Sequence, residues 1–467
     1  MSMPIDRLSP EDRIMLWGDD PWPQEMGALA ILDGTSLLDP DGRFRIEVVR
    51  RAIEGRLHLV PRFRQLLCVP RRGLGGPFWV DAPRFDIADH VQVVPPPDMA
   101  DEARLLIGVE QLRRRRLDRS RPLWGMWFLP GLADGRVGLF IKMHHVIADA
   151  VAGVATLGIL LDPTPEATAA GAQPWVPAPA PAPTRADLLA DNLRRHIEEL
   201  GRVLPRLARP VTTWRGMRAA WPAMRQALAE EPGTRTSLDR RVGAGRTLVL
   251  IRTKLDQVKE VAHAHDAKVN DVLLAATAGG LRRLLGHRGE RVDDALVRIA
   301  VSISLRERRG GAPQGNLVGE MAVPLRLGVS DPGRRLRQIA AETAERKART
   351  PPSAGALLRN GFARWVLLKA IDRQHVNVAS ADVPGPPVPF YLAGARVLEM
   401  FPVLPLIWKM PVGAGAISYA GQFNIMLVAD RDACPDLDVV AAGMRDELHA
   451  VGVRSSPDPL GISEGRW

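Results

Sequence analysis

Hydrophobic and polar positions follow two periods along this chain, and segments of the two kinds interleave from end to end. Apolar residues at every second position predict strands, and apolar residues three or four positions apart predict amphipathic helices. The predicted strands span residues 25–34, 76–82, 135–145, 245–255, 296–306, 316–328, 374–386 and 415–430. The predicted helices span residues 9–17, 43–59, 101–117, 150–162, 255–267, 269–286 and 436–451. Mixed strands and helices in two similar halves predict an α/β fold with two sheet-containing lobes.

An Ala/Pro-rich stretch, QPWVPAPAPAPT at residues 173–184, separates the two halves. Such a composition is typical of an extended, semi-rigid linker. A basic, helix-like region follows, and we expect it to pack on the linker rather than to contact a membrane surface. We therefore divide the chain into an N-terminal lobe (1–172), a linker with a basic helical connection (173–235) and a C-terminal lobe (236–467).

The chain carries a formal net charge of +10 over 467 residues. A basic surplus of this kind suits nucleic acid, anionic lipid or a polyphosphate ligand such as coenzyme A. The sequence has no zinc-finger spacing, no aromatic RNA-binding motif and no basic arm, so we do not expect nucleic acid. The arginine run at residues 113–116 is more typical of a solvated helix face than of a binding site.

Cysteines and apolar runs limit the class of protein further. The two cysteines, Cys68 and Cys434, are too few for a disulfide framework or a Cys-based zinc site. The N-terminus has no apolar signal-peptide core, and no apolar run reaches the ~18 residues that span a bilayer. We expect a cytoplasmic protein, with peripheral contact to a membrane or lipid-droplet surface as a further option.

Two adjacent histidines, His144 and His145, end the apolar strand in the stretch IKMHHVIADA. Strand alternation puts His145 on one face with Met143 and Ile141, and His144 on the other with Lys142. Adjacent strand histidines form a poor chelate, so we expect no metal. No G-x-S-x-G segment supports a serine hydrolase. A histidine facing a cavity is well suited to act as a general base, because its pKa lies near working pH.

The stretch HHVIADA resembles the HHxxxDG motif of CoA-dependent acyltransferases and peptide-synthetase condensation domains. Further stretches narrow the resemblance to the bacterial wax ester synthase/diacylglycerol acyltransferase family, in that family's order. They are LSPEDRIML, GALAILDG, RLHLVPRFRQ, LDRSRPLW, NDVLLA, GNLVG, VPGP and SYAG, from about residue 8 to about residue 430. The resemblance implies a two-lobed, chloramphenicol-acetyltransferase-like fold with mixed sheets and a tunnel between the lobes.

The resemblance also implies roles for the residues of the motif. His145 would be the general base for an acceptor hydroxyl, His144 would support the site, and Asp149 would orient the turn by pairing with Arg306. Ala150 stands where the motif has glycine, and Asp382 stands where the family's SNVPGP pattern has asparagine.

Two further motifs are expected near the substrate. Pro122, Leu123 and Trp124 match the family's PLW motif, and Asn270 with Asp271 match its ND motif. Structural interpretations remain open for some of these residues. Asp149 and Asn270 could each cap a helix, and Trp124 could be a core residue.

The implied activity is an acyl-CoA-dependent O-acyltransferase that esterifies diacylglycerol, a long-chain fatty alcohol or both, to give triacylglycerol or wax ester. Acyl-CoA would be a co-substrate, with no other cofactor. Two alternatives stay open. One is a condensation-type acyltransferase with a different hydroxyl or amine acceptor and a carrier-protein donor. The other is a non-catalytic lipid-binding relative in which Ala150 marks a decayed site.

Overall fold

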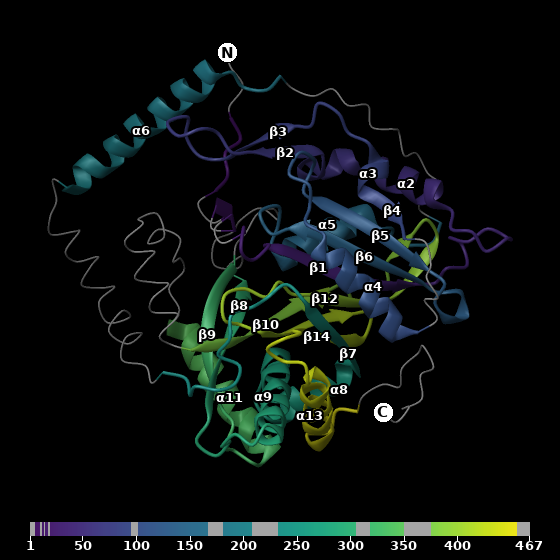
Figure 1. Ribbon diagram of the computed structural model, residues 1–467, viewed down its shortest axis with the longest axis vertical. Coiled ribbons are helices and arrows are strands. Elements are labelled where there is room, and N and C mark those ends of the chain that lie inside the picture. Colours follow the sequence, from purple (N-terminus) through teal and green to yellow (C-terminus); the bar gives the residue numbers. More distant parts are fainter. Residues whose placement is uncertain are drawn as a thin grey trace.

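The computed structural model describes residues 5–9, 12–13, 15–16, 19–94, 101–166, 181–207, 232–304, 318–349 and 375–454. Two six-stranded sheets form the centre of the molecule, and helices cover them (Figure 1). This arrangement confirms the predicted mixed α/β fold with two sheet-containing lobes. Among the described residues, no helix is both long enough and apolar enough to cross a bilayer.

The first sheet has the strand order β11-β12-β1-β6-β5-β4. Its strands span Tyr391–Leu392 (β11), Ala395–Val403 (β12), Glu25–Leu32 (β1), Val137–His144 (β6), Trp124–Pro130 (β5) and Val91–Val93 (β4). All neighbours pair antiparallel except β4 and β5. Because β11 and β12 come from the second half of the chain, the first sheet is completed by a crossover from that half.

The second sheet has the strand order β7-β14-β13-β10-β8-β9. Its strands span Arg246–Lys254 (β7), Gln422–Asp430 (β14), Val412–Tyr419 (β13), Val376–Pro384 (β10), Leu296–Ser304 (β8) and Val318–Arg326 (β9). Strand β10 pairs parallel with both β13 and β8. A small hairpin of Gln65–Cys68 (β2) and Phe78–Asp81 (β3) stands apart from both sheets.

Helices cover both sheets. The longer ones are Ile46–Glu54 (α2), Glu102–Arg114 (α4), Ala150–Leu160 (α5), Arg185–Leu207 (α6), Leu255–Ala264 (α8), Val269–His287 (α9), Pro332–Arg349 (α11) and Leu437–Ala450 (α13). Figure 1 shows α9, α11 and α13 together on one side of the second sheet, and α6 at the edge of the molecule. The buried core of this lobe joins that sheet to α9 and α13.

A separate apolar cluster joins the two lobes. It combines Phe140 of β6 and Val109 of α4 with Leu250 of β7 and Met426 of β14, all of them buried. The opposite face of β6, with Leu139, Ile141 and Met143, packs in the core of the first lobe. The predicted division of β6 into two faces is therefore confirmed.

A buried charged cluster crosses the same interface. The guanidinium of Arg252 on β7 donates to both carboxylate oxygens of Glu399 on β12, at 2.8 and 3.1 Å. It also lies 2.7 Å from the carboxylate of Glu102, at the start of α4. Arg252 and Glu399 are 8% and 6% exposed. This cluster links three elements from both lobes through one cation.

Two local predictions are wrong. Residues 415–430 form parts of two strands, β13 and β14, rather than one, because Ala420 and Gly421 have positive φ and turn the chain back. Asn270 does not cap α9. The helix begins at Val269, and the carboxylate of Asp271 accepts a hydrogen bond from the Lys268 N–H at 2.8 Å, which ties down that end.

Several predictions fall partly or wholly outside the described residues. Most of the linker 173–184 and the end of the basic helical region 185–231 do so, and so does Arg306. The part of that region which the structure describes is α6. The division of the chain into three segments and the tunnel between the lobes stay predictions.

Candidate active site

The two histidines mark the point where strand β6 ends and the chain turns toward α5. The N–H of His144 donates to the Leu123 carbonyl at 2.9 Å, and the N–H of His145 donates to the Gln24 carbonyl at 2.7 Å. The turn closes when the Ile147 N–H donates to the His144 carbonyl at 3.0 Å. Backbone bonds to two other segments therefore fix both histidines.

His144 is 3% exposed, so its imidazole is buried in the protein. Its Nδ1 accepts a hydrogen bond from the Val146 N–H at 3.0 Å, so the proton of a neutral ring is on Nε2. Nε2 lies 3.2 Å from a carboxylate oxygen of Asp19. This burial fits the supporting role predicted for His144, and that role stays a prediction.

Asp19 completes this support and is a residue that the sequence pattern did not single out. Its carboxylate accepts from the Gln24 N–H at 2.7 Å and pairs with Arg119. Burial acts to raise the pKa of Asp19, but the His144 ring, the Gln24 N–H and Arg119 together lower it to about 2. The ionised carboxylate thus connects both histidines, His144 through its ring and His145 through Gln24.

His145 differs from its neighbours in exposure. Every other residue from Val137 to Asp149 is buried, whereas His145 is partly exposed. Its backbone is fixed at the same time by the Gln24 carbonyl. A side chain that is accessible on a rigid support is the arrangement that proton transfer to or from a bound substrate needs.

Asp149 is fully buried and caps α5. Its carboxylate accepts from the Ala152 N–H at 2.8 Å, and its own backbone is extended. Ala150 is the first residue of α5 and does not have positive φ. The backbone at this position therefore does not require the glycine of the motif. The predicted pairing of Asp149 with Arg306 stays a prediction.

The PLW residues are buried in the first lobe. Trp124 is 2% exposed, stacks on Phe63 and His90 with ring centroids 4.5 and 4.6 Å apart, and donates from Nε1 to the Phe63 carbonyl at 2.8 Å. Leu123 supplies the carbonyl that receives the His144 N–H. Packing and backbone support account for these contacts. A substrate-binding role for Pro122, Leu123 and Trp124 stays a prediction.

The ND residues begin α9 and differ in their surroundings. Asp271 is 4% exposed, and its carboxylate accepts from the Lys268 N–H and, at 2.7 Å, from the hydroxyl of Thr343 on α11. It therefore fixes the helix start against a second helix. The side-chain oxygen of Asn270 is buried and has no hydrogen-bond partner within the part of the chain that the structure describes. A role in substrate binding stays a prediction for both residues.

Asp382 lies near the C-terminal end of β10. Asn270, in the first turn of α9, lies at the same end of the second lobe. Strand β8 follows α9 after a short connection and runs back along it, so the C-terminal end of β8 lies near the start of α9. Strand β10 runs parallel to β8, so its C-terminal end lies there too. Alternation puts Asp382 on the face of Val378, which packs against α9 and α13. Burial raises the pKa of Asp382 from 3.8 to about 6.

Replacing Asp382 with asparagine is expected to stabilise the protein at about pH 8 and to have little effect near pH 4. The raised pKa means that the folded protein holds this proton more tightly than the unfolded chain does. The wild-type stability that this carboxyl provides is therefore present below pH 3.8 and lost as the pH rises through about 6. The gain should be at most about 3 kcal/mol. Urea unfolding at several pH values measures it, and an equal effect at all pH values would contradict the prediction.

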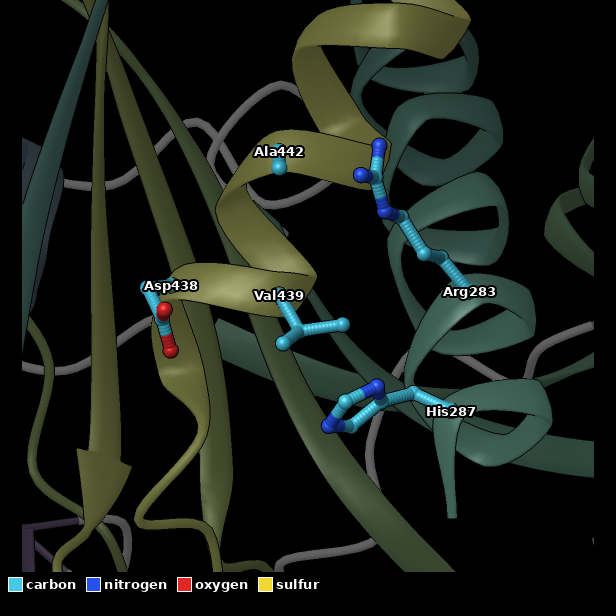
Figure 2. A pocket seen from close by; sticks show the side chains of 5 residues that line it. All are labelled: Arg283, His287, Asp438, Val439 and Ala442. Atoms are coloured by element: carbon cyan, nitrogen blue, oxygen red, sulfur yellow. The ribbon is translucent and has the colours of Figure 1, made fainter. Parts of the chain in front are cut away.

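A shallow hollow of about 440 Å³ lies between α9 and α13 (Figure 2). It is lined by Arg283, His287, Asp438, Val439 and Ala442. Arg283 and His287 are in the last turns of α9, whereas Asn270 is in its first turn. Since α9 is roughly 28 Å long, this hollow is remote from that end of the helix. Within the described residues, no group of three or more His, Cys, Asp or Glu side chains could hold a metal ion.

Two family models cover most of the chain. Residues 8–273 match the wax ester synthase/diacylglycerol acyltransferase catalytic domain, and residues 314–451 match the WS/DGAT C-terminal domain. The chain is 29% identical to a protein of Mycobacterium tuberculosis H37Rv named probable diacylglycerol O-acyltransferase tgs1, over 91% of this chain and 90% of that protein. A second protein of the same strain, also named as a diacylglycerol O-acyltransferase, is 30% identical over 94% of this chain and 95% of its own length.

Solved structures share the fold. The wax ester synthase/diacylglycerol acyltransferase from Marinobacter aquaeolei VT8 aligns with a TM-score of 0.64 and 23% identity, over 96% of this chain and 100% of that one. The first condensation domain of the CDA synthetase aligns with a TM-score of 0.59 and 14% identity, over 97% and 96% of the two chains. These likenesses confirm the two-lobed, chloramphenicol-acetyltransferase-like fold.

Proposed function

Because this chain belongs to the wax ester synthase/diacylglycerol acyltransferase family and is an acyltransferase, we propose that it esterifies diacylglycerol, a long-chain fatty alcohol or both with acyl-CoA. His145 acts as the general base. The observation that carries this assignment is that His145 alone is accessible in the buried segment from Val137 to Asp149. The relatives' names support diacylglycerol as an acceptor.

In the proposed reaction, the His145 imidazole removes the proton of the acceptor hydroxyl. The alcohol oxygen then attacks the thioester carbonyl directly, and the C–S bond breaks as the ester bond forms. The proton returns from His145 to the sulfur, so CoA leaves as a thiol. The reaction uses acyl-CoA as co-substrate and needs neither a resident cofactor nor a covalent enzyme intermediate.

The support around His145 is consistent with this role. The Gln24 carbonyl holds the His145 backbone, and Asp19, through the Gln24 N–H, holds the same segment. A fixed base needs little reorganisation when the substrate binds, which favours a productive geometry. The ring of His144 is buried against Val146 and Asp19, which leaves His145 as the histidine of the pair that a substrate can reach.

An acceptor panel tests the proposed function. Labelled palmitoyl-CoA is offered with diacylglycerol, with hexadecanol, with a long-chain amine or with no acceptor. We expect labelled ester with at least one of the two alcohols. The condensation-domain likeness makes a different acceptor the second candidate. Product with the amine alone, or only with a carrier-protein thioester as donor, would favour that candidate. No turnover under any condition would favour a non-catalytic lipid-binding relative.

Replacing Asp149 with asparagine separates two roles of this residue. Asparagine caps a helix as well as aspartate does, so a cap alone predicts a nearly unchanged protein. The proposed pairing with Arg306 predicts a loss of about 3–5 kcal/mol, because a buried guanidinium would lose its carboxylate. We expect the larger loss, measured by urea unfolding. A matched loss on replacing Arg306 with methionine would support the pairing, and two small effects would rule it out.

A further inference from the structure

Helix α6 carries a row of large apolar side chains that are exposed to solvent. Leu189, Leu193, Ile197 and Leu200 are 54%, 63%, 60% and 57% exposed. At about 100° per residue, the four positions fall within roughly 80° of the helix circumference. We call this row the α6 stripe. Single exposed apolar residues are ordinary, but four on one face of one helix form a continuous apolar surface.

The opposite face of α6 is held on the body of the protein. Asp191 pairs with the guanidinium of Arg7 at 2.6 Å, and both side chains are 6% exposed. Asn192 donates to the Gly73 carbonyl at 3.0 Å, and Leu188 is buried. On a helical wheel, these anchoring positions point roughly 145° away from the middle of the stripe. The body of the protein therefore presents the stripe outward, at the edge of the molecule where α6 lies (Figure 1).

Exposed basic and apolar groups lie on α6 itself and on the neighbouring loop. The side chain of Arg194 on α6 is 63% exposed, lies roughly 60° around the helix from the nearest stripe residue, and is 3.1 Å from the Asp191 carboxylate. The loop between β2 and β3, which contacts α6 through Gly73, adds exposed Arg71 and Arg72. Val69, at the start of that loop, is 63% exposed. An outward apolar row with arginines beside it has the pattern of a helix that lies in the plane of an anionic lipid interface.

We propose that the α6 stripe, with Arg71, Arg72 and Arg194 near it, docks the protein on an anionic phospholipid bilayer surface. The four aliphatic side chains enter the head-group region, and the arginines contact lipid phosphates. This proposal deepens the proposed function, since diacylglycerol, long-chain alcohols and their esters are water-insoluble and have to be exchanged with a lipid phase. The net charge of +10 favours the same partner.

Vesicle binding tests the proposal without any substrate. Full-length protein is sedimented with vesicles of phosphatidylcholine alone or with added phosphatidylglycerol. Wild type should bind the anionic vesicles, and added salt should weaken the binding. The double variant Leu193→Glu/Ile197→Glu should bind at least about tenfold more weakly. Ile107→Glu, which changes a 58% exposed isoleucine on α4 in the same way, is the matched control and should bind as wild type does.

The outcomes separate this proposal from its rivals. Equal binding by wild type and the double variant, or no wild-type binding to anionic vesicles, overturns it. A wild-type dimer that becomes monomeric in the double variant would show instead that the stripe joins two copies. If the double variant has a lower melting temperature, Leu193→Ser/Ile197→Ser replaces it. Because no acyl transfer is measured, failure here leaves the proposed reaction untouched, and His145→Ala should bind vesicles normally.

Discussion

Replacing His145 with alanine is expected to lower the rate of ester formation by about 10²–10⁴-fold, the usual contribution of a general base. The side chain is partly exposed, and only its backbone N–H is needed for the Gln24 bond, so alanine should leave the melting temperature nearly unchanged. The measurement is the rate of labelled ester formation at saturating substrates, alongside thermal unfolding.

Two other histidines serve as controls. His144→Ala should lower the stability as well as the rate, because it removes a buried ring that contacts Val146 and Asp19. His287→Ala, which changes a residue lining the hollow at the far end of α9, should affect neither quantity. Near-normal turnover in His145→Ala with no turnover in a folded His144→Ala would reverse the assignment of the two roles.

Replacing Arg252 with methionine is expected to lower the free energy of unfolding by about 3–5 kcal/mol. The change leaves the carboxylates of Glu399 and Glu102 in the lobe interface without the cation that pairs with both. The hydrophobic contacts of the arginine stem are largely kept by methionine, so the loss reports the stranded charges. Urea unfolding measures it.

Two further variants serve as controls for the prediction at Arg252. Arg291→Met removes a guanidinium whose side chain is 89% exposed and should change the stability by less than about 1 kcal/mol. Adding Glu399→Leu to Arg252→Met should recover part of the loss, because one of the two stranded carboxylates is then gone. Equal stability of the Arg252 and Arg291 variants would show that the charged cluster does not hold the lobes together.

Local patterns in the sequence predicted most of the helices and strands, because each depends on neighbouring residues. The alternation in β6 correctly separated Met143 and Ile141 from Phe140 and Lys142. The hairpin of β13 and β14 was missed, since its turn consists of only Ala420 and Gly421 and carries a single turn-forming residue, Gly421. The crossover of β12 into the first sheet depends on pairing with β1, far away in sequence, and no local pattern contains it.

The same distinction applies to the candidate site. The histidine pair and Asp149 lie in one short motif, so the sequence reveals them together. Asp19 lies in the segment just before β1, and its neighbours in sequence give no sign of a contact with His144. Trp124 is part of a motif, yet its contacts with Phe63 and His90 are those of a core residue. A motif identifies a segment, and the fold then determines which of its side chains reach the site.

Direct acyl transfer from CoA to an alcohol is tested most directly by the balance of products. Purified protein is given labelled palmitoyl-CoA with or without the acceptor that the panel identifies, and free CoA, ester and free fatty acid are all measured. Direct transfer predicts that CoA appears only when the acceptor is present, in an amount equal to the ester formed. Equal CoA release without the acceptor, accompanied by free fatty acid instead of ester, would contradict it.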